Sequence, residues 1–290
     1  MSEIHKIKLK DGREMGYVEF GDPKGFPVIY CHGWPSAKYE GLYFDPEAKE
    51  HGVRLISIDR PGMGDSTYKP DLTFYQWPDD VKELMDSLDI KNFGVFGVSG
   101  GTPYALACAH KLKDSVKRTY IYGGLAPIHS KNYGRKYENL KKLAISTNNI
   151  PNFTRRAIKV FRKVLRKRPK LYLWILKSRI PKEDRKRASQ RGIDIFIKNK
   201  LDAIKKTAEG ATHEAGLILN TWDFDIKDIE SYVKFWIGTN DDLTPMEMTE
   251  YMNETIPNSE MSIIDAGSHF AITDIADEIF DTMKQGYAHN

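Results

Sequence analysis

One stretch of this 290-residue chain, residues 93–106, constrains the fold more than any other. Its first half, Phe-Gly-Val-Phe-Gly-Val, is apolar and favours a strand, whereas its second half predicts a helix with Thr102 as its cap and Pro103 in the first turn. Between the halves lies Gly-Val-Ser-Gly-Gly (97–101), a G-x-S-x-G pattern in the strand, turn and helix context that this motif requires. The pattern predicts a strained backbone at Ser99, held by small residues two positions away on either side.

Outside its middle third, the chain alternates between strand-like and helix-like segments. Two β-like runs, 4–10 and 13–20, flank Asp11-Gly12, which predicts a two-residue hairpin. Besides the strand before Ser99, we expect strands at 28–31, 53–58, 116–122, 233–237 and 261–264, and helices at 79–88, 103–111 and 270–284. The alternation predicts an α/β fold, a mostly parallel sheet with helices on both faces and an active site at the carboxyl ends of its strands.

Composition narrows the class of protein further. Hydrophobic residues make up 40% of the chain and charged residues 29%, which argues against disorder. The first ten residues hold no apolar segment and the longest notable apolar run, 171–176, is short, so we expect neither a signal peptide nor a membrane span. Cys31 and Cys108 lie in apolar segments, which favours buried thiols and a cytoplasmic location. No spacing of Cys or His residues indicates a metal site.

The middle of the chain, residues 126–215, lacks strand-like patterns and carries the positive charge. Residues 151–191 contain sixteen Lys or Arg against two acids, a net charge of +14, and since the whole chain has +4 the remainder has 4 − 14 = −10. Helical spacing in this segment is carried by five positions, Ala157, Ile158, Phe161, Val164 and Leu165. We therefore expect a helical cap at 126–215, inserted into a core formed by 1–125 and 216–290.

The basic segment 151–191 has three interpretations. We favour a cap whose apolar stripe closes the site and whose charges face water, because charge runs are usually solvated. Peripheral docking on anionic lipid is the second, with Phe153, Phe161, Tyr172 and Trp174 available for the interface. Attraction of an acidic substrate or a nucleic acid is the third. Nucleic-acid binding is the least favoured, since no recognised nucleic-acid module accompanies the charge.

Three side chains suited to nucleophilic catalysis follow predicted strands, in the order Ser99, Asp241, His269. A serine hydroxyl needs a base to accept its proton, and the base needs an acid to orient it. Asp242 and Asp265 are alternatives for the acid. We favour Asp241 because it is the first acid in the loop after its strand.

The oxyanion of an acyl-transfer reaction needs two backbone donors, one just after the nucleophile and one from the loop after an early strand. Gly100 N–H fits the first role and Trp34 N–H the second. Four further residues are expected to shape this loop and to line a pocket with aromatic walls: His32, Gly33, Tyr104 and Phe270.

Together, these motifs resemble the α/β-hydrolase superfamily, and more narrowly its capped, cofactor-free serine hydrolases. The resemblance rests on five segments: His-Gly-Trp-Pro (32–35), Asp-Arg-Pro-Gly-Met-Gly-Asp-Ser (59–66), the G-x-S-x-G turn, the loop 238–245, and Gly-Ser-His-Phe (267–270). It implies an eight-stranded, mostly parallel sheet with an antiparallel second strand, an acyl-enzyme mechanism and no cofactor.

The resemblance leaves several activities open. We expect a serine hydrolase that cleaves a small-molecule carboxylic ester; thioesterases, lactonases and carbon–carbon bond hydrolases share the pattern, as do binding or signalling proteins of this fold with little turnover. Epoxide hydrolases use Asp at the position of Ser99, which disfavours that activity. Proline iminopeptidases usually carry Trp at the position of Gly100.

Overall fold

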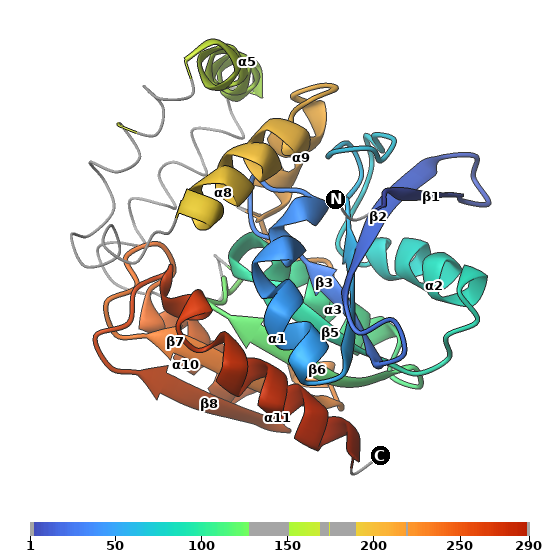
Figure 1. Cartoon of the computed structure of the whole chain (residues 1–290), viewed down its shortest axis with the longest axis vertical. Coiled ribbons are helices and arrows are strands. Elements are labelled where there is room, and N and C mark those ends of the chain that lie inside the picture. Colours follow the sequence, from blue (N-terminus) through green and yellow to red (C-terminus); the bar gives the residue numbers. More distant parts are fainter. Residues whose placement is uncertain (1–2, 128–150, 169–173, 175–189, 219, 289–290) are drawn as a thin grey trace.

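The computed structural model describes residues 3–127, 151–168, 174, 190–218 and 220–288. Its centre is an eight-stranded sheet with the order β1-β2-β4-β3-β5-β6-β7-β8 (Figure 1). The strands are β1 (His5–Lys8), β2 (Glu14–Gly21), β3 (Phe26–Cys31), β4 (Val53–Ile58), β5 (Phe93–Val98), β6 (Val116–Tyr122), β7 (Tyr232–Gly238) and β8 (Ser259–Ile264). Only β2 runs antiparallel to its neighbours, and all other adjacent pairs are parallel. The predicted sheet, including its antiparallel second strand, is confirmed.

The hairpin between β1 and β2 closes with one more loop residue than predicted. Leu9 N donates to Arg13 O at 2.8 Å, which leaves Lys10, Asp11 and Gly12 in the loop. Gly12 has a φ of 88°, the left-handed conformation that a three-residue loop needs at its last position. The two-residue prediction is wrong because Asp-Gly serves this longer loop equally well.

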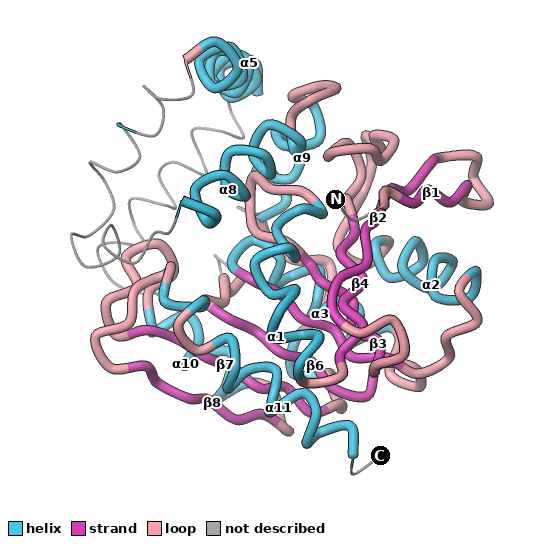
Figure 2. The backbone as a smooth tube through the Cα atoms, in the orientation of Figure 1, coloured by secondary structure: helices cyan, strands magenta, loops and turns pink. Residues whose placement is uncertain are grey.

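Helices cover both faces of the sheet (Figure 2). One face packs with α1 (Asp45–Glu50), α11 (Ala276–Ala288) and the 3₁₀ segment η1 (Lys38–Phe44), and the other with α2 (Trp77–Ser87), α3 (Thr102–Lys111) and α10 (Met246–Thr255). Strand residues alternate between the two cores: Val28 and Tyr30 of β3 belong to the first, and Ile29 and Cys31 to the second. Burial on both faces explains the continuous apolar runs in the sequence.

The last helix begins later than predicted. A 3₁₀ turn, η4 (Ala271–Thr273), precedes α11, which starts at Ala276. Ile272 lies in this turn and Ile275 just before α11, and their separation by three residues resembles helical spacing ahead of the helix. Both side chains still pack against the core that α11 covers.

Three helices from the predicted cap, α5 (Pro151–Lys167), α8 (Gln190–Ala203) and α9 (Glu209–Ile218), lie together beside the core (Figure 1). Ile158 and Phe161 of α5 pack with Ala203, Ile204, Ala208 and Ala211 and, from the core, Ala37 and Met63. Ala157, predicted to share this apolar face, is instead exposed, because the packed face is centred on Ile158 and Phe161 and Ala157 lies at its edge. Helix α9 continues to Ile218, beyond the predicted boundary at 215.

Of the aromatic residues considered for lipid docking, Trp174 is 70% exposed and Phe161 packs inward. The side chains of Phe153 and Tyr172 lie outside the described residues, as does much of segment 151–191. Within the described part of the chain, no helix combines the length and apolar character needed to span a bilayer.

Candidate active site

Ser99 lies at the turn between β5 and α3 with a φ of 53°. This left-handed conformation is strained for a residue with a side chain and persists only where the surroundings impose it. Here the strand and helix approach very closely: a Cβ atom at Gly97 would lie 2.8 Å from Ala105 Cβ, and one at Gly101 would lie 2.0 Å from Cys31 O. The predicted strain and the need for both glycines are confirmed.

Thr102 is the first residue of α3 and does not cap it. A 3₁₀ turn, η2 (Ser99–Gly101), precedes the helix, and Gly101 takes the cap position. The hydroxyl of Thr102 donates to Ser99 O at 2.8 Å and accepts a hydrogen bond from Leu125 N at 3.3 Å. The predicted cap is wrong because the turn moves the helix start; Thr102 instead ties the Ser99 turn to the segment after β6.

Asp241 and His269 meet at the carboxyl ends of β7 and β8. His269 Nδ1 lies 2.7 Å from Asp241 Oδ2, which also accepts a hydrogen bond from the Thr244 hydroxyl at 2.8 Å. The backbone amides of Leu243 and Thr244 donate to Asp241 Oδ1 at 2.9 and 2.8 Å. Four donors therefore surround a carboxylate that is only 6% exposed.

These donors determine the charge of Asp241. Burial alone would raise the pKa of the carboxyl, but the hydrogen bond and charge of His269, together with the bonds from Thr244, hold its pKa below the ordinary value. Asp241 is thus an anion at neutral pH, and it can stabilise a protonated His269.

The other two acids considered for this position lie elsewhere: Asp242 and Asp265 are exposed. Gly123 directly follows β6, the strand between β5 and β7, and lies against both His269 and Asp241. A Cβ atom there would lie 3.0 Å from His269 Cε1 and 3.3 Å from Asp241 Oδ2, and its φ of 56° also favours glycine. Gly123 therefore lets the Asp241–His269 pair approach the sheet edge next to Ser99.

The two proposed oxyanion donors, Gly100 and Trp34, lie side by side. An ideal Cβ at Gly100 would be 3.1 Å from Trp34 N, 2.7 Å from Trp34 Cβ and 3.2 Å from Ile218 Cδ1 of α9. Residue 100 consequently has no space for any side chain. Trp34 itself is 38% exposed, and its indole Nε1 donates to Ala211 O of α9 at 2.9 Å.

The four remaining pocket candidates occupy different surroundings. Gly33 lies near Ser99, since its ideal Cβ would be 3.7 Å from Ser99 Cβ. His32 is fully buried beneath the loop, with Nδ1 2.9 Å from Gly33 O. Phe270 is 38% exposed and its ring meets that of His269 edge-on. Tyr104 is fully buried in the core, edge-on to Phe74 and Trp77, and offers no exposed surface to a ligand.

A family model of the alpha/beta hydrolase fold matches residues 27–274, most of the chain. The chain belongs to this family. The α/β-hydrolase architecture also agrees with a solved structure of an esterase from Thermogutta terrifontis, which has a TM-score of 0.70 and 21% identity over 99% of both chains. At that identity, the likeness concerns the fold alone.

Curated relatives of this α/β hydrolase differ in activity. A proline iminopeptidase from Arabidopsis thaliana is 31% identical over 123 residues, which are 40% of this chain and 31% of that protein. A soluble epoxide hydrolase from Corynebacterium sp. (strain C12) is 34% identical over 119 residues, 40% of each protein. The aligned segments thus span less than half of these relatives, and they do not decide between the two activities.

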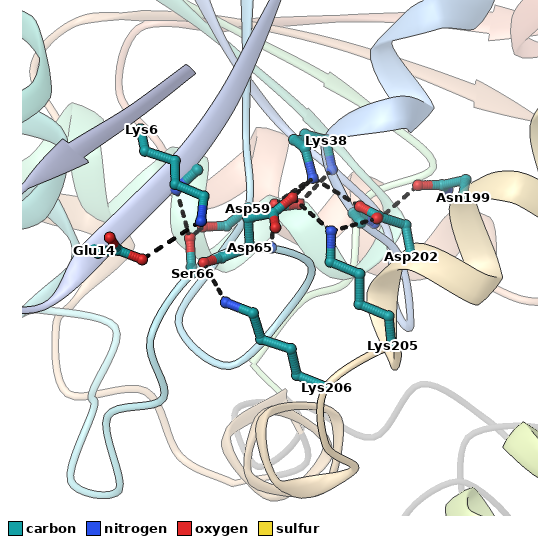
Figure 3. A network of polar contacts seen from close by, with 12 residues as sticks. Lys6, Glu14, Lys38, Asp59, Asp65, Ser66, Asn199, Asp202, Lys205 and Lys206 are labelled. Carbon is teal, nitrogen blue, oxygen red and sulfur yellow. Dashed lines mark hydrogen bonds and ion pairs between the residues drawn. The ribbon is translucent and has the colours of Figure 1, made fainter. Parts of the chain in front are cut away.

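A second polar centre lies where α8 meets the loop after β4 (Figure 3). Lys38 is fully buried, and its Nζ lies 2.7 Å from Asp59 Oδ2, 2.7 Å from Asp65 Oδ2 and 2.8 Å from Asp202 Oδ2. Lys205 adds contacts with Asp65 at 2.5 Å and Asp202 at 2.8 Å. We call these five residues the Lys38 cluster. It joins the loop after β4 to α8 and the segment that follows it.

The Lys38 cluster has the carboxylates of a cation site but carries its own cation. Oxygens of Asp59, Asp65 and Asp202 lie within 4.8 Å of one another. The ammonium of Lys38 contacts all three, so these oxygens already have the positive partner that a metal would supply. Burial raises the pKa of Asp59 to about 6 despite Lys38, whereas for Asp65 the lysines overcome the effect of burial and lower its pKa to about 2.

Sequence reasoning did not assign roles to several residues that shape this site: Lys38, Glu40, Arg60, Gly123, Glu214 and Thr244. Arg60 belongs to the motif 59–66 and Thr244 to the loop 238–245, so the sequence signal for these two segments could have indicated both residues. The others gain their partners only through tertiary contacts that no sequence spacing indicates.

Proposed function

We propose that this chain is a serine hydrolase that cleaves carboxylic esters through an acyl-enzyme intermediate. The observation that carries the proposal is the 2.7 Å contact between His269 Nδ1 and Asp241 Oδ2, at the sheet edge where Ser99 directly follows β5. With Nδ1–H donated to Asp241, the other ring nitrogen of His269 is left as the base for the serine proton.

The reaction would begin when Ser99 Oγ attacks the ester carbonyl carbon and its proton passes to His269 Nε2. Gly100 N–H and Trp34 N–H would stabilise the oxyanion. The carbon–oxygen bond to the alcohol then breaks, and the alcohol leaves with the proton from His269. A water molecule, deprotonated by His269, attacks the acyl carbon, and the acid departs as Ser99 recovers its proton.

Two features favour ester cleavage over the activities of the curated relatives. Epoxide hydrolases use an Asp nucleophile, and this chain has Ser99. Proline iminopeptidases usually carry Trp after the nucleophile, but Trp34 and Ile218 fill the space beside Gly100, where even a Cβ atom would be 2.7 Å from its neighbour. These apolar side chains also suit a substrate with an apolar acyl or alcohol part.

Labelling with a fluorophosphonate tests the proposal. We expect one covalent adduct, located on Ser99 by mass spectrometry and absent in His269→Ala, because only an activated serine attacks the phosphorus atom. If folded protein gives no adduct, Ser99 is not activated, and a ligand-binding role without turnover replaces the proposal.

The choice of acid gives a second prediction. In Asp241→Asn, the amide oxygen would accept the amides of Leu243 and Thr244, leaving the amide NH₂ toward His269 Nδ1. His269 would then carry its proton on Nε2 and could not accept one from Ser99, so we expect kcat to fall about 10⁴-fold.

Asp242→Asn is the matched control, since Asp242 is exposed. We expect its kcat for p-nitrophenyl acetate to stay close to that of the unmodified protein. The opposite ranking of the two variants would assign the acid to Asp242.

A further inference from the structure

The loop that carries Trp34 N–H is held by a buried arginine. Arg60 Nη1 donates to His32 O at 2.5 Å, and Arg60 Nη2 donates to Gly33 O at 3.0 Å. On the opposite side, Gly33 N donates to Glu40 Oε2 at 2.5 Å. The peptide between His32 and Gly33 is therefore fixed at both its oxygen and its nitrogen.

The contact at Gly33 O determines where the next amide points. Gly33 O and Trp34 N–H belong to one peptide group, and in a planar trans peptide the C=O and N–H point in opposite directions. Arg60 therefore turns Trp34 N–H away from itself, and Trp34 N lies beside Gly100. A cationic donor at the oxygen also polarises the peptide, which strengthens its N–H as a donor.

Arg60 is oriented by a residue of the cap. Its Nη2 atom forms an ion pair with Glu214 Oε1 of α9, and the two side chains are 1% and 4% exposed. Its guanidinium also lies over the Tyr104 ring, 4.5 Å from the ring centre. Burial raises the pKa of Glu214 to about 7, and Arg60 opposes that rise, so the charge of Glu214 depends on this contact.

Helices α8 and α9 contact the same loop directly. Trp34 Nε1 donates to Ala211 O, three residues before Glu214, and Lys200 Nζ of α8 donates to Pro35 O at 2.6 Å. The loop is thus held by Arg60 and by contacts with both α8 and α9.

We propose that Glu214 and Arg60 are positioning residues for the oxyanion site, through which cap helix α9 sets the direction of Trp34 N–H. This inference rests on the proposed function. It implies that the cap contributes to the stabilisation of the transition state as well as to the enclosure of substrate.

Glu214→Gln and Glu214→Leu test the inference. Leu removes the partner of Arg60, whereas Gln keeps an oxygen acceptor without the charge. With p-nitrophenyl butyrate, we expect kcat to fall on the order of tenfold to a hundredfold in Glu214→Leu, less than the 10²- to 10³-fold typical of deleting an oxyanion donor. Glu214→Gln should lose less, and KM should change little in both, because the ground state makes no oxyanion.

A trifluoromethyl ketone with a propyl chain provides the second readout. Ser99 Oγ adds to its carbonyl carbon, the serine proton passes to His269, and the carbonyl oxygen becomes an oxyanion. We expect the inhibition constant to rise by the same factor by which kcat/KM falls in each variant, since both report the oxyanion. Glu209→Gln, the other acid of α9, is the matched control and should change neither value.

The possible outcomes separate the inference from the proposed function. If the unmodified protein reacts with ester and ketone but folded Glu214→Leu keeps its kcat and inhibition constant, the inference is overturned and the function stands. Should Glu214→Leu not fold, unchanged values in Glu214→Gln overturn the inference in the same way. If the unmodified protein reacts with neither compound, both are overturned.

Discussion

We expect Ser99→Ala to hydrolyse p-nitrophenyl esters roughly 10⁵ to 10⁶ times more slowly than the unmodified protein, because the members of a catalytic triad act as a unit. Without the hydroxyl, neither His269 nor the proposed oxyanion donors would have a nucleophile to assist. Alanine retains a Cβ atom, so the φ of 53° at this residue is no more strained than it is with serine.

Steady-state hydrolysis and thermal unfolding of Ser99→Ala check this result together. We expect the unfolding temperature to remain close to that of the unmodified protein, so that lost turnover reports chemistry. The double variant Ser99→Ala, His269→Ala should be scarcely slower than Ser99→Ala alone. If Ser99→Ala retained most of the turnover, the reaction would use another nucleophile and the proposed mechanism would fail.

Much of this fold can be predicted from the sequence because its signals are local. The strand before Ser99, its turn and α3 follow from an apolar run, glycines at 97 and 101, and a proline at a helix start. Errors arise where two local structures share one pattern. Asp-Gly suits both two- and three-residue hairpin loops, and the three-residue separation of Ile272, in a 3₁₀ turn, from Ile275, just before α11, resembles helical spacing.

The site is predictable only as far as its residues follow strands. Ser99, Asp241 and His269 can be found because the carboxyl ends of parallel strands share one edge of the sheet. The residues that hold the Trp34 loop cannot be found in this way: Arg60 pairs with Glu214 of α9, 154 positions further along the chain. Tyr104 illustrates the converse, because its aromatic ring near Ser99 in sequence packs into the core.

The Lys38 cluster could not be anticipated for the same reason. Sequence patterns treat a lysine as an exposed residue, and an isolated buried ammonium would be very costly. The position of Lys38 is explained only once Asp59 and Asp65, from the loop after β4, and Asp202, from α8, converge on its ammonium. The cluster therefore links α8 to the loop after β4 through buried ion pairs.

We expect Lys38→Met to lower the free energy of unfolding by about 3 to 5 kcal/mol, the loss typical when one partner of a buried ion pair is removed. Methionine fills most of the space but leaves Asp59, which is fully buried, without a cation of its own. Urea unfolding followed by circular dichroism measures the change. Amide hydrogen exchange in α8 should also quicken, because Asp202 loses its anchor to the core.

Lys205→Met is the matched control for this effect. Its side chain is 32% exposed, and Lys38 remains bound to all three carboxylates, so we expect a loss of about 1 kcal/mol or less. Equal losses in the two variants would mean that the cluster is stabilised by net charge rather than by the buried contacts of Lys38.

The loss of stability in Lys38→Met should also depend on pH, and the titration of Asp59 determines whether that loss grows or shrinks as pH rises. Its pKa in the folded protein, about 6, lies above the ordinary value of 3.8, so the folded state binds more protons than the unfolded chain between these values, and stability falls as pH rises through that window. Removing Lys38 raises this pKa further and extends the window upward. Lys38→Met should therefore lose more stability at pH 8 than at pH 5, where Asp59 can be buried as a neutral acid. An equal loss at both values would mean that Asp59 remains ionised without Lys38, with Lys205 as its counter-ion.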